Sequence, residues 1–160
     1  MLVKTYGSAV YGVEAITITI EVNVMEGNVM YYMVGLPDSA VKESIQRIES
    51  AIKTLGYPMP RTKLVINLAP AGIRKSGSSF DLAIAIGILA ANKQLNNPET
   101  LKEYVIMGEL NLDGTVQPIK GALPIAITAR KEGFKGLIVP QQNCREAGMV
   151  DTLTVYGVSH

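Results

Sequence analysis

The chain has 160 residues, 48% of them hydrophobic and 18% charged, so it can bury one core and is not a disordered segment. Fifteen Lys and Arg against fourteen Asp and Glu give a net charge of +1, which excludes the general positive field that draws proteins onto nucleic acids or acidic membranes. A single cysteine excludes an intrachain disulfide, and a single histidine leaves no Cys and His set spaced for zinc.

The first half of the sequence predicts a hairpin followed by a helix. Apolar and polar residues alternate over 16–24, which predicts a strand with one buried face. A glycine-asparagine turn and a second strand over 29–34 predict that the two strands pair as a hairpin. Apolar residues then recur every three or four positions over 41–55, which predicts a helix with Asp38 as its N-cap and Gly56 as its C-terminal cap.

The second half predicts two more helices and several short strands. Residues 80–93 are apolar nearly all round, which predicts the most buried helix, with Ser78 or Ser79 as its N-cap. The other predicted elements are a strand over 63–68, a hairpin over 104–119 that turns at Asp113-Gly114, a helix over 121–132, strands over 137–139 and 153–158, and a short helix over 144–150.

These elements predict an α/β (α+β) sandwich in which helices cover a mixed sheet, rather than a doubly wound parallel sheet. No repeat or linker interrupts residues 1–160, so we expect a single domain, and we expect it to belong to a longer protein. Residues 1–12 lack the apolar run of a secretory signal, and the longest apolar stretch, 82–91, is too short for the ~20 residues that cross a bilayer. We therefore expect a cytoplasmic protein with no membrane partner.

A cationic loop over 69–78 precedes the most buried predicted helix. Its two cations, its glycine and its hydroxyls lie before a helix whose free N–H groups favour an anion. The alternative is a capped loop with solvated charges. No Gly-x-x-x-x-Gly-Lys-Ser/Thr string occurs, so we do not expect this chain alone to hydrolyse ATP. The candidate contacts to an anion are Arg74, Lys75, Ser76, Gly77 and Ser78.

Catalytic residues are only weakly indicated. Ser79 and a lysine could form a dyad in which a desolvated lysine accepts the serine proton, although serine also suits a helix cap. A Ser/His/Asp triad is disfavoured because the only histidine is His160, at the chain end. Asp81 begins an apolar helix, and we expect it to interact with backbone N–H groups in a structural role. Cys144 is expected to be an incidental thiol, and no metal site is predicted.

A series of motifs follows one order along the chain: Val34-Gly35-Leu36-Pro37 with Val41-Lys42-Glu43, Ile66-Asn67-Leu68-Ala69-Pro70-Ala71, Lys75-x-Gly77 with Phe80-Asp81-Leu82-Ala83-Ile84-Ala85, Gly108-Glu109-Leu110 with Gly114, and Pro118-Ile119-x-Gly121. Over essentially the whole chain, these motifs resemble the amino-terminal domain of magnesium-chelatase-like AAA+ ATPases of the ComM type. The resemblance implies a fold similar to the second domain of the fifth small-subunit ribosomal protein and to the Lon protease domain.

The similarity to Lon offers a test of the Ser/Lys alternative. Setting residues 75–79 beside the Lon motif Lys-Asp-Gly-Pro-Ser places Ser79 at the nucleophile. Aligning 108–121 with the matching Lon stretch places Leu123 where the catalytic lysine stands. Because leucine cannot accept a proton, the resemblance implies no catalytic residue here unless Lys120, three positions earlier, reaches Ser79.

We therefore expect a non-catalytic domain that helps a magnesium-chelatase-like ATPase to assemble and to engage DNA. The resemblance implies an AAA+ module that follows this domain and uses ATP and Mg, homo-hexamers, and, in ComM, DNA branch migration during natural transformation. No cofactor is expected in this chain, and the expected partners are DNA, its own AAA+ module and neighbouring subunits. With these partners, the loop residues Arg74, Lys75, Ser76, Gly77 and Ser78 are the candidate contacts to DNA or to a neighbouring subunit. The alternatives are a Lon-type peptidase that uses Ser79 and Lys120, and a magnesium-chelatase subunit, which follows from the family name alone.

Overall fold

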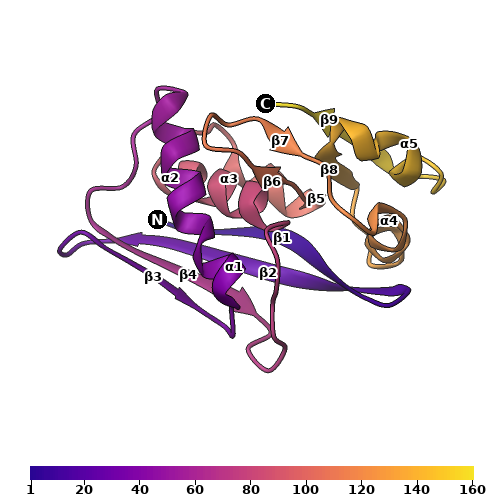
Figure 1. The fold of residues 1–160 in the computed structure, drawn as a ribbon, viewed down its shortest axis with the longest axis horizontal. Helices are drawn as coiled ribbons and strands as arrows, with labels where there is room; N and C mark the ends of the chain where they lie inside the picture. Colours follow the sequence, from indigo (N-terminus) through magenta and orange to yellow (C-terminus); the bar gives the residue numbers. More distant parts are fainter.

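One mixed sheet of seven strands organises the fold in the computed structural model, which describes residues 1–160 (Figure 1). The strand order is β3-β4-β2-β1-β5-β8-β9, and β6 and β7 form a small separate hairpin. The strands are β1 (Leu2–Tyr11), β2 (Glu14–Met25), β3 (Met30–Val34), β4 (Lys63–Ala69), β5 (Tyr104–Ile106), β6 (Glu109–Leu110), β7 (Val116–Gln117), β8 (Gly136–Pro140) and β9 (Thr154–Val158).

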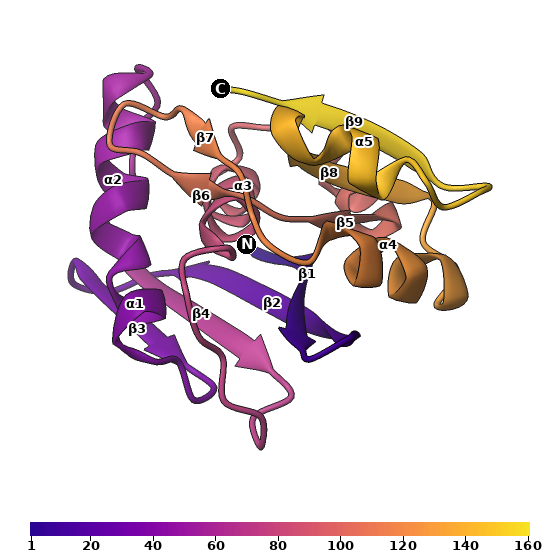
Figure 2. The ribbon, with the colours of Figure 1, turned by 45° about the vertical axis from the view of Figure 1, so that its right-hand side comes forward.

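The helices form two groups, one on each face of the sheet. In Figure 2, α1, α2 and α3 lie together, and α3 packs on β1 and β2. On the other face, α4 packs against β2, β1 and β8, and α5 lies beside β8 and β9. The helices are α1 (Ser39–Lys42), α2 (Ser44–Thr54), α3 (Asp81–Ala91), α4 (Ala122–Lys131) and α5 (Cys144–Ala147), with 3₁₀ turns η1 (Pro98–Glu103) and η2 (Gln141–Asn143).

Strand pairing in the sheet is mixed. Strand β2 pairs antiparallel with β1 and with β4, whereas all other neighbours in the main sheet are parallel. A mixed sheet covered by helices confirms the predicted sandwich of the α/β (α+β) class and excludes a doubly wound parallel sheet.

Two hydrophobic clusters lie on opposite faces of the sheet. Successive residues of a strand point to opposite faces, and β5 and β8 show the consequence. Ile106 and Ile138 pack in the larger cluster with α2 and α3, whereas Val105 and Leu137 belong to the smaller cluster with α4. Strands β5 and β8 are therefore covered on both faces.

Strand β2 is confirmed, but its predicted partner is wrong. Its central residues Ile18, Ile20 and Val22 are fully buried, as the alternating pattern predicts. However, β4 lies between β2 and β3, so the segments 16–24 and 29–34 do not form a hairpin. The crossover through α1 and α2 returns the chain between them and makes β3 and β4 parallel. The free side of β2 is occupied by β1, which the sequence pattern does not reveal.

The predicted helix caps are confirmed around α1 and α2 but not at α3. Asp38 caps α1, because its Oδ1 accepts a hydrogen bond from the Val41 N–H at 2.8 Å, and Gly56 has the positive φ, 88°, of a helix end. The predicted cap of α3 is wrong, since its N-cap residue is Phe80 and no side chain caps it.

The predicted hairpin over 104–119 is only partly present. Strands β6 and β7 pair around the Asp113-Gly114 turn, over two residues each. Strand β5 instead joins the main sheet between β1 and β8. A short apolar strand is stabilised mainly by the neighbours it packs against in the fold, so its own sequence does not specify its partner.

The turn after β3 requires glycine, and this can be tested. Gly35 has a φ of 100°, and a Cβ there would stand 2.1 Å from the Leu68 carbonyl oxygen. We expect Gly35→Ala to lower the free energy of unfolding by roughly 2 kcal/mol or more, measured by urea unfolding. The control is Gly72→Ala, where a Cβ meets nothing within 4 Å. Equal stability of the two variants would contradict this account of the turn.

Candidate functional site

The loop between β4 and α3 is anchored by a buried lysine. Lys75 is 0% exposed, and its Nζ donates hydrogen bonds to the carbonyl oxygens of Gly35, at 2.7 Å, and of Pro70. Its backbone N–H donates to Leu36 O at 3.0 Å, and its carbonyl accepts from the Asp38 N–H at 2.8 Å. This position corrects the prediction that Lys75 is a surface contact, because its ammonium lies inside the protein and cannot reach a phosphate in solvent.

The other predicted contact residues remain on the outside of this loop. Arg74, Ser76 and Gly77 are exposed, and Ser78 is half-buried. The Tyr11 hydroxyl donates to the Arg74 carbonyl at 2.9 Å, which ties the loop to the end of β1. The Gly77 N–H donates to Asp38 Oδ2 at 3.2 Å. The loop is therefore held along its length while its cationic edge faces solvent.

Ser79 and Lys120 line the same cavity. This cavity, the serine cavity, has a volume of about 330 Å³ and lies between β1, the loop before α3 and the segment before α4. Ser79 is half-buried and Lys120 is exposed. No hydrogen bond joins the Ser79 hydroxyl to the Lys120 ammonium or to any other group of the chain. The lining residues are Ser8, Ala9, Val10, Tyr11, Ser76, Ser79, Phe80, Met107, Lys120 and Ile125.

The segment that carries Lys120 is fixed by its neighbours. The Asn143 side-chain amide both donates to the Ile119 carbonyl and accepts from the Ile119 N–H, each at 2.9 Å. Gly121 has a φ of 81°, and a Cβ there would stand 2.8 Å from a methyl group of Val10. The backbone is therefore held on both sides of Lys120, by Asn143 at Ile119 and by Val10 of β1 at Gly121. Sequence reasoning misses Asn143, because nothing near it in sequence indicates this contact.

Leu123 is the residue that the sequence alignment with Lon sets at the catalytic lysine. Its side chain is half-buried and packs against the smaller hydrophobic cluster. Its backbone N–H donates to Glu146 Oε2 at 2.8 Å, which satisfies a free amide in the first turn of α4. An aliphatic group at this place supplies no general base to Ser79.

Asp81 is the most highly connected charged group in the core. It is fully buried, and its carboxylate accepts hydrogen bonds from the Ser44 hydroxyl at 2.7 Å, from Arg47 Nε at 2.7 Å and Nη2 at 2.9 Å, and from the Leu110 N–H at 3.1 Å. The hydrogen bond to Asp81 is the main reason that the pKa of Arg47 is raised. Asp81 thus binds α2 and the β6–β7 hairpin to α3, rather than the N–H groups of its own helix.

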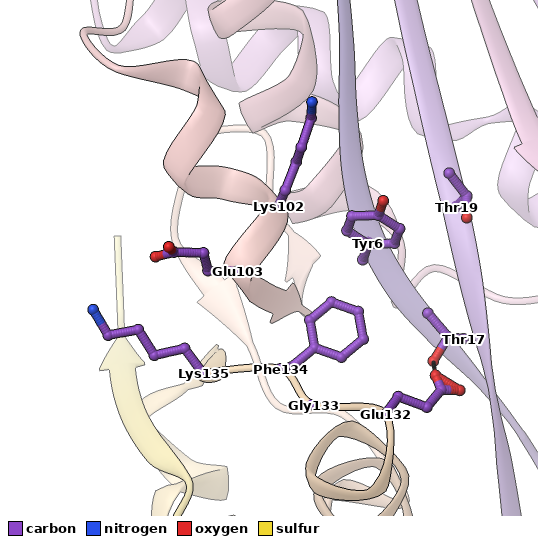
Figure 3. Close-up of a pocket in the computed structure, with 9 residues that line it drawn as sticks. All are labelled: Tyr6, Thr17, Thr19, Lys102, Glu103, Glu132, Gly133, Phe134 and Lys135. Carbon is purple, nitrogen blue, oxygen red and sulfur yellow. Dashed lines mark hydrogen bonds between the residues drawn. The ribbon is translucent and has the colours of Figure 1, made fainter.

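A second, larger hollow has a different charge pattern. It is shown in Figure 3, has a volume of about 650 Å³, and is lined by two lysines and two glutamates. Glu132 accepts a hydrogen bond from the Thr17 hydroxyl at 2.6 Å, and Lys102 pairs with Glu99 at 2.8 Å. None of the predicted site residues lines this hollow.

The remaining candidate groups, which are metal ligands, Cys144 and His160, form no further site. No cluster of three or more His, Cys, Asp or Glu side chains is arranged to hold a metal ion. Cys144 is half-buried and unpaired. His160 lies beside an apolar groove between α2 and α3, away from the serine cavity. None of the helices has the length and apolar character needed to span a membrane.

Comparison with known proteins shows the family to which the chain belongs. The profile described as subunit ChlI of Mg-chelatase matches residues 20–143. The chain belongs to this family. It is 39% identical over 155 residues to the competence protein ComM of Haemophilus influenzae, a match that covers 97% of this chain and 30% of ComM. It is 44% identical over 143 residues to the uncharacterized protein YifB of Escherichia coli, covering 89% of this chain and 28% of YifB.

The chain is also similar, at lower identity, to a Lon protease. Lon protease 2 of Bacillus subtilis is 31% identical over 105 residues, which is 66% of this chain and 18% of that protein. The chain therefore spans about a third or less of the length of the curated relatives it matches. The resemblance to the magnesium-chelatase-like ComM family is confirmed.

The anchoring role of Lys75 predicts a loss of stability on substitution. Lys75→Met keeps a long side chain but leaves the carbonyl oxygens of Gly35 and Pro70 without a donor. We expect the free energy of unfolding at pH 7 to fall by about 1–3 kcal/mol, measured by circular dichroism in urea. An unchanged stability would show that the ammonium does not hold the loop.

The difference in stability between wild type and Lys75→Met should depend on pH. Burial lowers the pKa of Lys75 below that of a lysine in water. Between this lowered pKa and about 10.4, the unfolded chain binds more protons than the folded chain, so folding is favoured as the pH rises. The stability of wild type relative to Lys75→Met should increase from pH 7 toward pH 10. A decrease would contradict this assignment, and Lys131→Met, at an exposed lysine, is the control.

Proposed function

We propose that this chain is a non-catalytic domain of a magnesium-chelatase-like AAA+ ATPase and that it helps the whole protein to assemble and to engage DNA. Membership of the ChlI family supports the class of the whole protein. One relative is named a competence protein, which favours a role in natural transformation, with DNA branch migration as the work of the whole protein. ATP and Mg would then be bound outside this chain, which has no P-loop sequence.

The observation that carries the proposal is the exposed cation Arg74 on the anchored loop before α3. Arg74 and Ser76 are exposed on a loop whose backbone is anchored by Lys75 and Tyr11. Lys120 opens onto the same cavity as Ser76. Exposed cations on an anchored backbone suit a phosphate backbone, because little loop freedom is lost on binding.

The state of Ser79 supports a binding role over a catalytic one. A serine nucleophile needs a base within hydrogen-bonding reach, and no amine donates to or accepts from its hydroxyl here. Leu123 is aliphatic, and the Lys75 ammonium is engaged by two backbone carbonyls. The residues needed for proton transfer are therefore not assembled around Ser79.

DNA engagement through this loop predicts a salt-dependent interaction. We expect the chain to bind a fluorescein-labelled oligonucleotide with an affinity that falls steeply between 50 and 200 mM salt, as the release of counterions requires. Arg74→Gln should weaken binding roughly threefold to tenfold and reduce the salt slope by about one, because one phosphate contact is lost. Fluorescence anisotropy measures both.

Arg145→Gln is the matched control, since Arg145 is exposed on α5. An equal effect of the two substitutions would contradict the assignment of the contact to the loop. Self-association of the chain that does not change with salt, in the absence of DNA binding, would assign this surface to subunit assembly alone.

The second candidate function is a Ser/Lys peptidase, which is favoured by the shared cavity of Ser79 and Lys120. Our proposal predicts no cleavage of unfolded casein or of fluorogenic peptides above background, and no difference between wild type and Ser79→Ala. Ser76→Ala, at the neighbouring hydroxyl, is the control. Cleavage that is lost in Ser79→Ala and kept in Ser76→Ala would replace the binding proposal with the catalytic one.

A further inference from the structure

We propose that the serine cavity is a phosphate-binding site in which the Lys120 ammonium and the hydroxyls of Ser76 and Ser79 hold the phosphate oxygens. This inference rests on the proposed function in one respect, because a DNA phosphate is the expected source of the ligand. The site itself is defined by this chain's own residues and can be tested with phosphate alone.

The charge of the cavity favours an anion. Lys120 is the only charged residue in its lining, which contains no carboxylate. The hollow of Figure 3 differs, because its two lysines share their surroundings with two glutamates. A phosphate entering that hollow would meet carboxylates, whereas in the serine cavity it would meet a single cation.

The cavity also offers unused hydrogen-bond donors. The side chains of Ser76 and Ser79 make no hydrogen bond within the chain, whereas the third serine in the lining, Ser8, donates to the Ile16 carbonyl at 3.3 Å. Phosphate oxygens accept several hydrogen bonds at once, and those from an ammonium are the stronger charge-assisted kind. The two free hydroxyls and the ammonium therefore match a tetrahedral anion with several acceptors.

Both walls of the cavity are already in place. One wall is the loop fixed by Lys75, and the other is the segment fixed through Ile119 by Asn143. Glu146 contacts the same part of the chain, because its Oε2 accepts a hydrogen bond from the Leu123 N–H, but it does not line the cavity. Binding would thus require movement of side chains but not of the backbone.

The size of the cavity indicates what carries the phosphate. A volume of about 330 Å³ lies at the lower end of the ~300–1,000 Å³ range of ligand sites and exceeds the need of one small anion. The exposed aromatic residue Tyr11, which is 44% accessible, also lines the cavity. A phosphate with its sugar attached would fill this space, as in a nucleotide or one unit of a DNA strand.

The test uses Lys120, whose amine can be replaced by a guanidinium without loss of charge. Arginine keeps the positive charge but cannot act as a proton acceptor, so Lys120→Arg separates phosphate binding from general-base catalysis. Titration with inorganic phosphate, followed by NMR shifts of the 76–79 amides, should give an affinity that Lys120→Gln weakens roughly tenfold or more and Lys120→Arg changes less than about threefold. Lys131→Gln, at the far end of α4, is the control and should match wild type.

A parallel titration with a single-stranded oligodeoxythymidylate identifies the source of the phosphate. If Lys120→Gln weakens binding of the oligonucleotide and of free phosphate together, DNA is the source and both proposals stand. If phosphate shifts the 76–79 amides but the oligonucleotide does not bind, the site takes a free phosphate or nucleotide, and the proposed DNA function fails.

The inference is overturned if phosphate leaves the 76–79 amides unshifted, whether or not the oligonucleotide binds. It is also overturned if Lys120→Gln and Lys131→Gln weaken phosphate equally, because the effect is then one of general charge. Ser79→Ala provides a second measurement, in which loss of one hydroxyl should weaken phosphate binding about threefold or more without affecting the fold.

Discussion

The buried ammonium of Lys75 is the constraint on which the candidate site depends. A charged amine inside a protein is costly unless it is paired, and here it meets backbone carbonyls rather than a carboxylate. One of those carbonyls belongs to Gly35, which is held in a conformation and a close approach that only glycine permits. The loop before α3 and the turn after β3 thus form one unit, and the exposed Arg74 and Ser76 depend on it for their positions.

A second polar unit, centred on Asp81, stabilises the other side of the same loop. Its carboxylate is satisfied by donors from α2 and from the residue that ends β6, so the first turn of α3 is held from two directions. Ser79 lies just before this turn. The loop that carries Ser76 and Ser79 is therefore held by the Lys75 ammonium within it and by the Asp81 carboxylate just after it, and residues 8–11 of β1 line the same cavity.

The sequence predicts the parts of this arrangement that depend on local chemistry. Asp38 is a cap because its side chain reaches an amide three residues away. In β2, apolar and polar residues alternate because one face of the strand is buried. Strand order does not follow from such patterns, since the place of β1 and the parallel pairing of β3 with β4 depend on contacts between distant segments.

The site residues divide in the same way. Ser79 and the loop over 74–78 stand out in the sequence, because serines, a glycine and cations before an apolar helix are recognisable at once. The burial of Lys75 is not recognisable, since a lysine beside an arginine in a loop has the pattern of an exposed cation. The contact of Asn143 with the backbone of Ile119 joins residues 24 positions apart, and no local pattern indicates it.

We propose that this arrangement is suited to hold a ligand, because hydrogen bonds hold the backbone of the loop before α3 and of the segment around Lys120, while no base is hydrogen-bonded to the Ser79 hydroxyl. The most direct measurement of this claim is an NMR spectrum of the lysine ammonium groups of the intact chain, recorded before and after addition of phosphate. The account predicts that the Lys75 ammonium is protected from exchange with water throughout and that the Lys120 signal changes only when phosphate is added. A Lys75 ammonium that exchanges freely, or a Lys120 signal that depends on Ser79 without any ligand, would contradict it.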